Sequence, residues 1–213
     1  MFIFLFYPHH SIQYMDKQDM KNSIDPQELM QSFMRSSRFA DKFLEQRKVF
    51  LWGPVTDKSA ERVVNQILFL DADQPGQPIT FYINSPGGMV TSGLAMLDVM
   101  NLVASPVHTV CVGLAASMGA VLLSAGVKGQ RACMPNARVM IHQPSLGGFR
   151  GTFADLEITA KEMQKTKDVL ALILAQNCNK PLEQINKDFN RDYWMGAQES
   201  VEYGIVDAVS AKI

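Results

Sequence analysis

The chain has 213 residues, of which 47% are apolar and 19% charged, a composition that supports a globular core and excludes wholesale disorder. Lysine and arginine total 20 against 21 aspartates and glutamates, so the formal net charge is −1. A near-neutral chain has no general electrostatic attraction to nucleic acid or to an anionic membrane, and we expect neither as a partner.

The first 33 residues are expected to form a flexible leader or N-terminal segment, separate from a folded domain over residues 34–213. Its apolar start, residues 1–7, is too short to span a bilayer, which requires about 20 apolar residues. It also lacks the basic start and the small-residue cleavage site of a signal peptide. We interpret it as a leader upstream of the mature start, with Met15 and Met20 as candidate initiators. A genuine ordered segment and a signal or anchor are the less favoured alternatives.

Beyond this segment, the apolar pattern predicts alternating helices and strands. Phe39 and Phe43 are spaced to share one helix face within residues 35–46. A helix capped by Thr56 follows, and Gly204 is placed to end the last helix. Strands are predicted at 48–52, 79–84, 107–112, 131–134, 138–141 and 205–209, a small-residue turn at 113–117, and helices at 94–102, 118–125, 152–176 and from 181. This alternation predicts an α/β fold.

The cysteines give no sign of a disulfide framework or a metal site. Cys111, Cys133 and Cys178 are widely spaced, and an odd number leaves one thiol over from any intramolecular pairing. The first two lie in apolar runs, where a thiol usually acts as a small buried hydrophobe. We therefore expect a reducing compartment, the cytoplasm, and no bound metal.

Ser117 is the first candidate for chemistry. It follows Gly-Leu-Ala-Ala, a stretch with three small residues, and precedes a predicted helix, so its hydroxyl lies where unpaired backbone N–H groups favour developing negative charge. Nucleophilic serines use such strand-to-helix corners. The alternative at this point is an ordinary helix-capping serine.

A glycine pair ends the preceding strand. Gly87 and Gly88 follow Asn-Ser-Pro, and a backbone N–H donor here could form an oxyanion hole together with that of Met118. An ordinary Pro-Gly turn explains the motif equally well. A phosphate loop is excluded, because the Gly-Lys-Ser/Thr ending is missing.

Histidine and aspartate candidates complete a possible catalytic set. His142 ends a predicted strand beside a loop and can serve as the general base for Ser117, whereas His108 lies within an apolar strand and is expected to be structural. No second histidine or carboxylate stands near His142 at metal-ligand spacing. The third member remains open among five aspartates, with Asp192 favoured because it lies in an irregular stretch: Asp155, Asp168, Asp188, Asp192 and Asp207.

Several separated motifs occur in a characteristic order. They are found at residues 82–88, 113–119, 138–144, 191–192 and 202–207. Together, over roughly residues 49–209, they resemble the proteolytic subunit of Clp protease, the ClpP family of serine peptidases. The resemblance implies the ClpP/crotonase-like α/β fold, built of repeated β-β-α units with a protruding handle helix.

The resemblance also implies roles for individual residues. Ser117 would be the nucleophile, His142 the base and Asp192 the third member of the triad, with Gly88 and Met118 N–H groups as the oxyanion hole. Three further positions match residues that bind substrate or link the rings: Gly147, Gly148 and Arg191.

The family's activity is ATP-dependent hydrolysis of unfolded proteins, which an AAA+ Clp unfoldase feeds into a closed chamber. The resemblance therefore implies two stacked seven-subunit rings of this chain, an unfoldase partner that uses the ATP, and no cofactor in the chain itself.

The sequence departs from the family's usual pattern at the groove that receives the unfoldase. In this groove, Thr80 and Ala132 stand where aromatic residues are usual. A separate departure is Asn190, which replaces an acidic residue before Arg191 and Asp192. The altered groove leaves two further hypotheses. The chain is a ring subunit that is active only together with a paralogous proteolytic subunit, or it is a structural ring subunit without activity of its own. An enoyl-CoA hydratase-like enzyme of the same fold is the remaining alternative, and it would need no Ser–His–Asp set.

Overall fold

The structure is a computed structural model that describes residues 38–145, 147–148 and 150–210. The chain divides into two compact units, Met1–Lys42 and Phe43–Ile213, and the fold and the site described below belong to the second. The predicted leader and the predicted domain start at residue 34 lie outside the described residues. The helix expected over residues 35–46 is present at residues 38–45.

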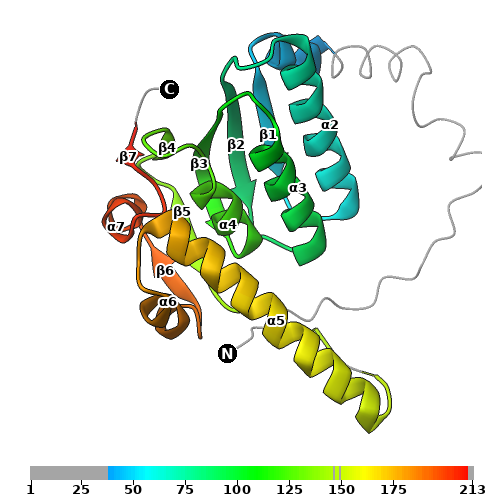
Figure 1. Ribbon diagram of the computed structural model, residues 1–213. Coiled ribbons are helices and arrows are strands. Elements are labelled where there is room, and N and C mark those ends of the chain that lie inside the picture. Colours follow the sequence, from blue (N-terminus) through cyan, green and yellow to red (C-terminus); the bar gives the residue numbers. More distant parts are fainter. Residues whose placement is uncertain (1–37, 146, 149, 211–213) are drawn as a thin grey trace, which may run out of the picture. The chain divides into compact units, whose positions relative to one another are not determined.

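One mixed sheet organises the second unit (Figure 1). Five strands run parallel in the order β1 (Lys48–Trp52), β2 (Ile79–Ser85), β3 (Val107–Ala116), β4 (Arg131–Cys133) and β7 (Ala208–Val209). A branch leaves this order at β3, which also pairs in parallel with β5 (Arg138–Ile141). The branch ends with β6 (Tyr193–Met195), which is antiparallel to β5.

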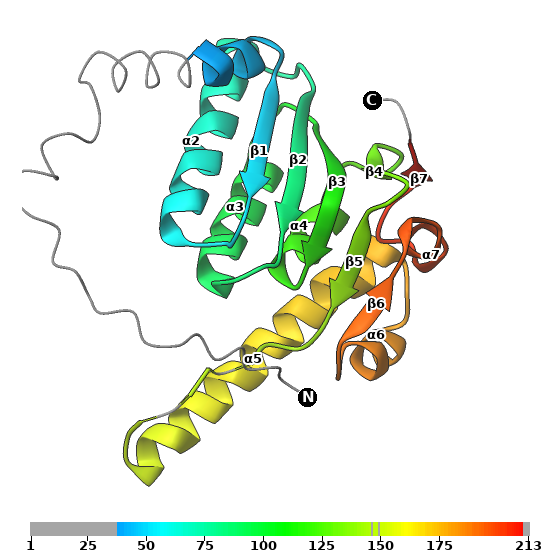
Figure 2. The ribbon, with the colours of Figure 1, turned by 180° about the vertical axis from the view of Figure 1, so that it is seen from behind.

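The helices that connect the strands cover one face of the sheet. α2 (Asp57–Asp73), α3 (Val90–Leu102) and α4 (Met118–Ser124) lie in front of the strands in Figure 1 and behind them in Figure 2. The C-terminal part adds α5 (Phe153–Cys178), α6 (Leu182–Asp188) and α7 (Ala197–Tyr203). The α/β prediction is confirmed. The order β4–β5–α5 forms a β-β-α unit, whereas strands and helices alternate singly from β1 to α4.

α2 shows how local sequence signals set an element. Thr56 and Ser59 form a capping box at its start, and the buried side chains recur at helical spacing: Ala60, Val63, Ile67 and Leu70. At its other end, the Arg47 guanidinium donates to the carbonyls of Leu70, Gln77 and Pro78 at 2.9–3.1 Å. Arg47 thus satisfies carbonyls at the end of the helix and in the following turn.

α5 packs against α4 and α6, and only its C-terminal half is buried. Its buried side chains are Leu170, Ala171, Leu174 and Cys178, and its first turns extend away from the sheet in Figures 1 and 2. Phe153 is 82% exposed and Ile158 62% exposed on the extended half, and Val169 and Leu172 are also exposed. α5 is therefore a protruding helix with apolar side chains that its own chain leaves uncovered.

Three predicted boundaries were wrong by more than two residues, and one of them is the start of α3, which is Val90 instead of residue 94. The turn expected at residues 113–117 is strand up to Ala116, because Gly113 takes a φ of 83° that bends β3 without ending it. After this bend β3 changes partner from β4 to β5. The last strand is Ala208–Val209 instead of 205–209, since the N–H groups of Ile205 and Val206 donate to the Ser200 carbonyl at the end of α7.

A buried ion pair anchors β4. Arg131 is 4% exposed and donates through two nitrogens to the carboxylate of Asp207, at 3.0 and 2.6 Å. Burial alone would raise the pKa of Asp207, but hydrogen bonds from the side chain and backbone of Arg131 and from the Gly129 N–H outweigh it and lower the pKa. The three cysteines are free thiols and all are buried, which was expected for Cys111 and Cys133. Within the described part of the chain, no helix combines the length and apolarity needed to cross a bilayer.

Candidate active site

Ser117 occupies a strained corner between β3 and α4. Its φ of 56° and ψ of −124° lie in a region that non-glycine residues rarely adopt, and such strain is typical of functional sites. The backbone is held on both sides: the Ser117 N–H donates to the Met140 carbonyl at 2.8 Å, and the Ser117 carbonyl accepts from Ala120 at 2.9 Å. The hydroxyl does not cap α4, so the helix-capping alternative is wrong.

The Ser117 hydroxyl instead faces His142. Ser117 Oγ and His142 Nε2 are 2.9 Å apart, and on the other side of the ring His142 Nδ1 is 3.3 Å from Asp192 Oδ1. The tautomer with the proton on Nδ1 places a donor on the side of the Asp192 carboxylate and leaves Nε2 to accept from the hydroxyl. Hydroxyl, imidazole and carboxylate thus form one connected chain, with the His142 side chain 26% exposed and that of Asp192 61% exposed.

Strand pairing brings these three residues together. β3 and β5 are parallel neighbours, with Ala116 opposite Met140, so both end at the same edge of the sheet. β5 and β6 are antiparallel, and their last pair is Ile141 with Tyr193. Continued by one residue, this register sets His142 opposite Asp192. Ser117 and His142 come directly after β3 and β5, and Asp192 directly before β6.

The glycine pair lies against this corner. Gly87 has a φ of 86°, and a Cβ built on it would be 2.6 Å from Ser117 Cβ and 2.9 Å from the Met118 nitrogen. Val55 pairs with Gly88 through the residues on either side of the glycine: the Val55 N–H donates to the Gly87 carbonyl, and the Val55 carbonyl accepts from the Met89 N–H. The Gly88 N–H takes no part in this pairing. Met118 is the first residue of α4, so its N–H has no acceptor within the helix. The packing of Gly87 on Ser117 was missed in the sequence, where the motif indicated only a turn or a ligand-binding loop.

The other candidate aspartates serve elsewhere. Each has a different polar partner: Asp155 with Thr152, Asp168 with Gln164, Asp188 with Tyr203 and Asp207 with Arg131. Among the five, Asp192 is the one that the structure brings to His142. The sequence had favoured it only because its stretch was irregular. That stretch in fact leads into β6, a strand that was not predicted.

The remaining predicted positions lie outside this cluster. Gly147 and Gly148 lie in the connection between β5 and α5, and Arg191 precedes Asp192; all three are exposed. In the described ranges no hydrogen bond or ion pair joins them to Ser117, His142 or Asp192. Nor do those ranges contain a group of three histidine, cysteine, aspartate or glutamate side chains that could hold a metal ion.

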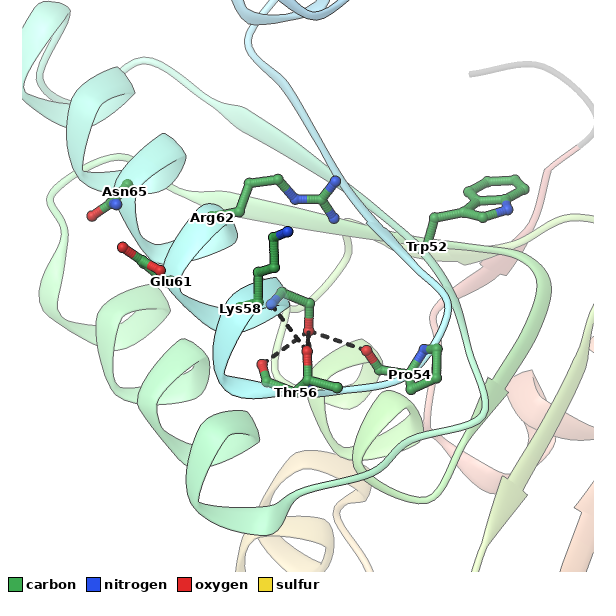
Figure 3. Close-up of a pocket in the computed structure, with 8 residues that line it drawn as sticks. Trp52, Pro54, Thr56, Lys58, Glu61, Arg62 and Asn65 are labelled. Atoms are coloured by element: carbon green, nitrogen blue, oxygen red, sulfur yellow. Dashed lines mark hydrogen bonds between the residues drawn. The ribbon is translucent and has the colours of Figure 1, made fainter. Parts of the chain in front are cut away.

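Two surface hollows lie apart from the cluster. Thr80 and Ala132, which stand where aromatic residues are usual in the family, line a hollow of about 230 Å³ together with His108. Burial lowers the pKa of His108. A larger pocket of about 620 Å³ lies where β1 leads into α2 and includes Trp52 and Arg62 among its lining residues (Figure 3). None of the predicted site residues lines either hollow.

A serine at a strained corner, hydrogen-bonded to a histidine that in turn meets an aspartate, has the geometry of a nucleophilic serine site. The sequence matches the Clp protease family over residues 31–212 and belongs to that family. The family assignment makes the chain a ClpP-type peptidase of the serine class.

Proposed function

We propose that this chain is a serine endopeptidase in which Ser117 is the nucleophile, His142 the general base and Asp192 the residue that orients His142. The observation that carries the proposal is the connected chain of contacts, 2.9 Å from Ser117 Oγ to His142 Nε2 and 3.3 Å from His142 Nδ1 to Asp192 Oδ1. The first distance is within reach for proton transfer from Ser117 to His142. The second is an ion-pair distance, at which the carboxylate can orient the ring and stabilise its charged form.

In the proposed mechanism, Ser117 Oγ attacks the carbonyl carbon of a peptide bond while His142 Nε2 takes its proton. Asp192 stabilises the imidazolium that forms. His142 then gives the proton to the leaving amine, and the acyl-enzyme remains. A water molecule, activated by His142 in the same way, hydrolyses the ester and restores the Ser117 hydroxyl.

The tetrahedral intermediates carry negative charge on the former carbonyl oxygen. We propose that the backbone N–H groups of Gly88 and Met118 stabilise this oxyanion. The Gly88 N–H takes no part in the pairing with Val55, and the Met118 N–H has no acceptor within α4. Loss of one donor of this kind typically lowers the rate by about 10²–10³-fold. The mechanism uses side chains and backbone alone, so the chain requires no cofactor of its own.

The proposal extends to assembly. The uncovered apolar residues of α5, with Phe153 82% exposed and Ile158 62% exposed, support contact with further copies of this chain. The sheet face opposite α2 and α3 also carries aromatic side chains, Phe50 stacked on Tyr82 at 5.0 Å and Trp52 59% exposed. We propose two stacked rings of seven subunits that enclose the sites, with Gly147, Gly148 and Arg191 serving the substrate strand and the contact between rings.

A cytoplasmic AAA+ Clp unfoldase would spend ATP to feed unfolded proteins into this chamber. Thr80 and Ala132 line the 230 Å³ hollow at the groove where such a partner docks in the family. Because both replace aromatic residues, they favour a second possibility, in which docking requires a paralogous subunit in the same ring.

Replacement of the nucleophile tests the catalytic assignment. Ser117→Ala should assemble like the wild type and lose cleavage of a short fluorogenic peptide by at least about 10³-fold. A fluorophosphonate probe should label the wild type at Ser117 and leave the variant unlabelled. An enoyl-CoA hydratase-like enzyme would not be labelled, and undiminished cleavage by Ser117→Ala would refute the assignment. If only a mixture with a paralogue cleaves the peptide, the ring depends on that partner.

A further inference from the structure

Asp192 is poorly held by packing, although the proposed mechanism requires it to face His142. Its side chain is 61% exposed, and in the described part of the chain its carboxylate has one polar partner, His142 Nδ1 at 3.3 Å. The backbone that carries Asp192 must therefore fix its position.

β6 fixes that backbone on one side only. The antiparallel pairing of β5 and β6 ends at Ile141 and Tyr193, directly beside His142 and Asp192. On the other side of Asp192 the regular pairing has ended, and the chain must connect to α6 through Asn190 and Arg191.

Gln143 supplies the missing attachment. Its N–H donates to the Phe189 carbonyl at 2.6 Å, and its side-chain Nε2 donates to the Asn190 carbonyl at 2.9 Å and to Asn190 Oδ1 at 3.3 Å. Phe189 is 1% exposed, so this attachment is anchored in the core. The two neighbours of His142 thus hold the chain on both sides of Asp192: Ile141 pairs with Tyr193, and Gln143 bonds to Phe189 and Asn190.

We infer that Gln143 is a positioning residue, whose side-chain amide holds the Asn190–Asp192 segment so that the Asp192 carboxylate stays opposite His142 Nδ1. The inference rests on the proposed function, because it assigns a task to the triad. Gln143 acts through the backbone of the segment and takes no part in proton transfer.

The effect should be on the chemical step. Without the amide donor, the segment is tied only through the Gln143 backbone and β6, and the carboxylate gains freedom to move. A displacement of about 1 Å at a catalytic group can cost about 10²-fold in rate. We therefore expect Gln143→Met to lower kcat by about 10–100-fold and to leave KM within about twofold of the wild type, since the lost interaction matters chiefly in the transition state.

Two further variants make the test specific. Gln143→Glu keeps the size and polarity of the side chain, but an ionised carboxylate has no donor, so its kcat should fall at least as far as that of Gln143→Met. Asn190→Ala removes only the 3.3 Å contact and keeps the backbone acceptor, so it is the matched control and should stay within about twofold of the wild type.

The decisive experiment is a double-mutant cycle with Asp192→Ala, measured by peptidase kinetics on the assembled enzyme with thermal melting as a check on folding. If Gln143 acts through Asp192, Gln143→Met should change the residual activity of Asp192→Ala by less than about twofold. Unchanged kcat in Gln143→Met, or the same fold-loss with and without Asp192, would overturn the inference. Full activity of Asp192→Ala alone would instead overturn the proposed triad.

Discussion

A methyl group at residue 87 would test how closely the glycine loop must approach the serine corner. In Gly87→Ala the new Cβ would lie 2.6 Å from Ser117 Cβ, 2.7 Å from the Ala116 carbonyl oxygen and 2.9 Å from the Met118 nitrogen. Carbon atoms pack best at about 3.5–4.0 Å, so the two Cβ atoms must separate by roughly 1 Å. Ala116 and Met118 offer backbone atoms, which are held by β3 and α4 and cannot rotate away.

The cost has two parts. A non-glycine residue at a φ of 86° loses about 1–2 kcal/mol from backbone conformation, and overpacking a well-packed site costs about 1–3 kcal/mol. We expect Gly87→Ala to lower the free energy of unfolding by about 2–5 kcal/mol. A displacement of about 1 Å at Ser117 should also lower kcat by about 10²-fold.

Gly76→Ala is the matched control. Gly76 has a φ of 78°, but a Cβ there would meet nothing within 4 Å. It should lose only the conformational part, about 1–2 kcal/mol, and keep full peptidase activity. The free energy of unfolding is measured in urea at equal protein concentrations, together with cleavage of a fluorogenic peptide. Equal losses of stability in the two variants, with activity retained in Gly87→Ala, would refute the packing argument.

Two predictions concern groups away from the site. In the folded chain the pKa of Asp207 is held below 3.8, so its stabilisation is fully present above about pH 4 and is lost as the pH falls through the folded-state pKa. Asp207→Asn should therefore destabilise the protein by about 1.5–3 kcal/mol at pH 7, because the buried Arg131 loses its charged partner and keeps only neutral acceptors such as the carbonyls of Ser124 and Asn177. The variant should also lose less stability in acid than the wild type; urea unfolding from pH 7 to pH 3 that shows parallel curves would contradict this. Burial raises the pKa of Cys178 to about 11, so iodoacetamide at pH 7.5 should label this thiol only after unfolding, and mass spectrometry that finds it alkylated in the native protein would count against its burial.

Local signals predicted most elements of this fold. The capping box at Thr56 and the helical spacing from Ala60 to Leu70 place α2, and β1 was found at the predicted residues, Lys48–Trp52. These signals are short-range: a cap, a periodicity or a stop involves residues within a few positions of each other. The errors came where long-range pairing decides. Gly113 bends β3 toward a second partner, and β6 exists because Tyr193–Met195 pairs with β5, more than 50 residues earlier in the chain.

The candidate site divides in the same way. The residue types and the motif order named Ser117 and His142, and resemblance to a family named Asp192, but the residues alone left five aspartates as candidates. The register of β5 and β6 chose among them, because it extends by one residue to set His142 opposite Asp192.

The sequence by itself determined the α/β class, the family and the chemical groups available for catalysis, because these depend on residue identity and on short-range pattern. Tertiary structure alone decided which groups meet. The contact of Ser117 with His142 depends on β3 and β5 ending at one edge of the sheet, and the close approach of Gly87 to Ser117 depends on how two distant loops pack. Contacts between residues far apart in the chain arise from strand register and packing, which no local pattern encodes.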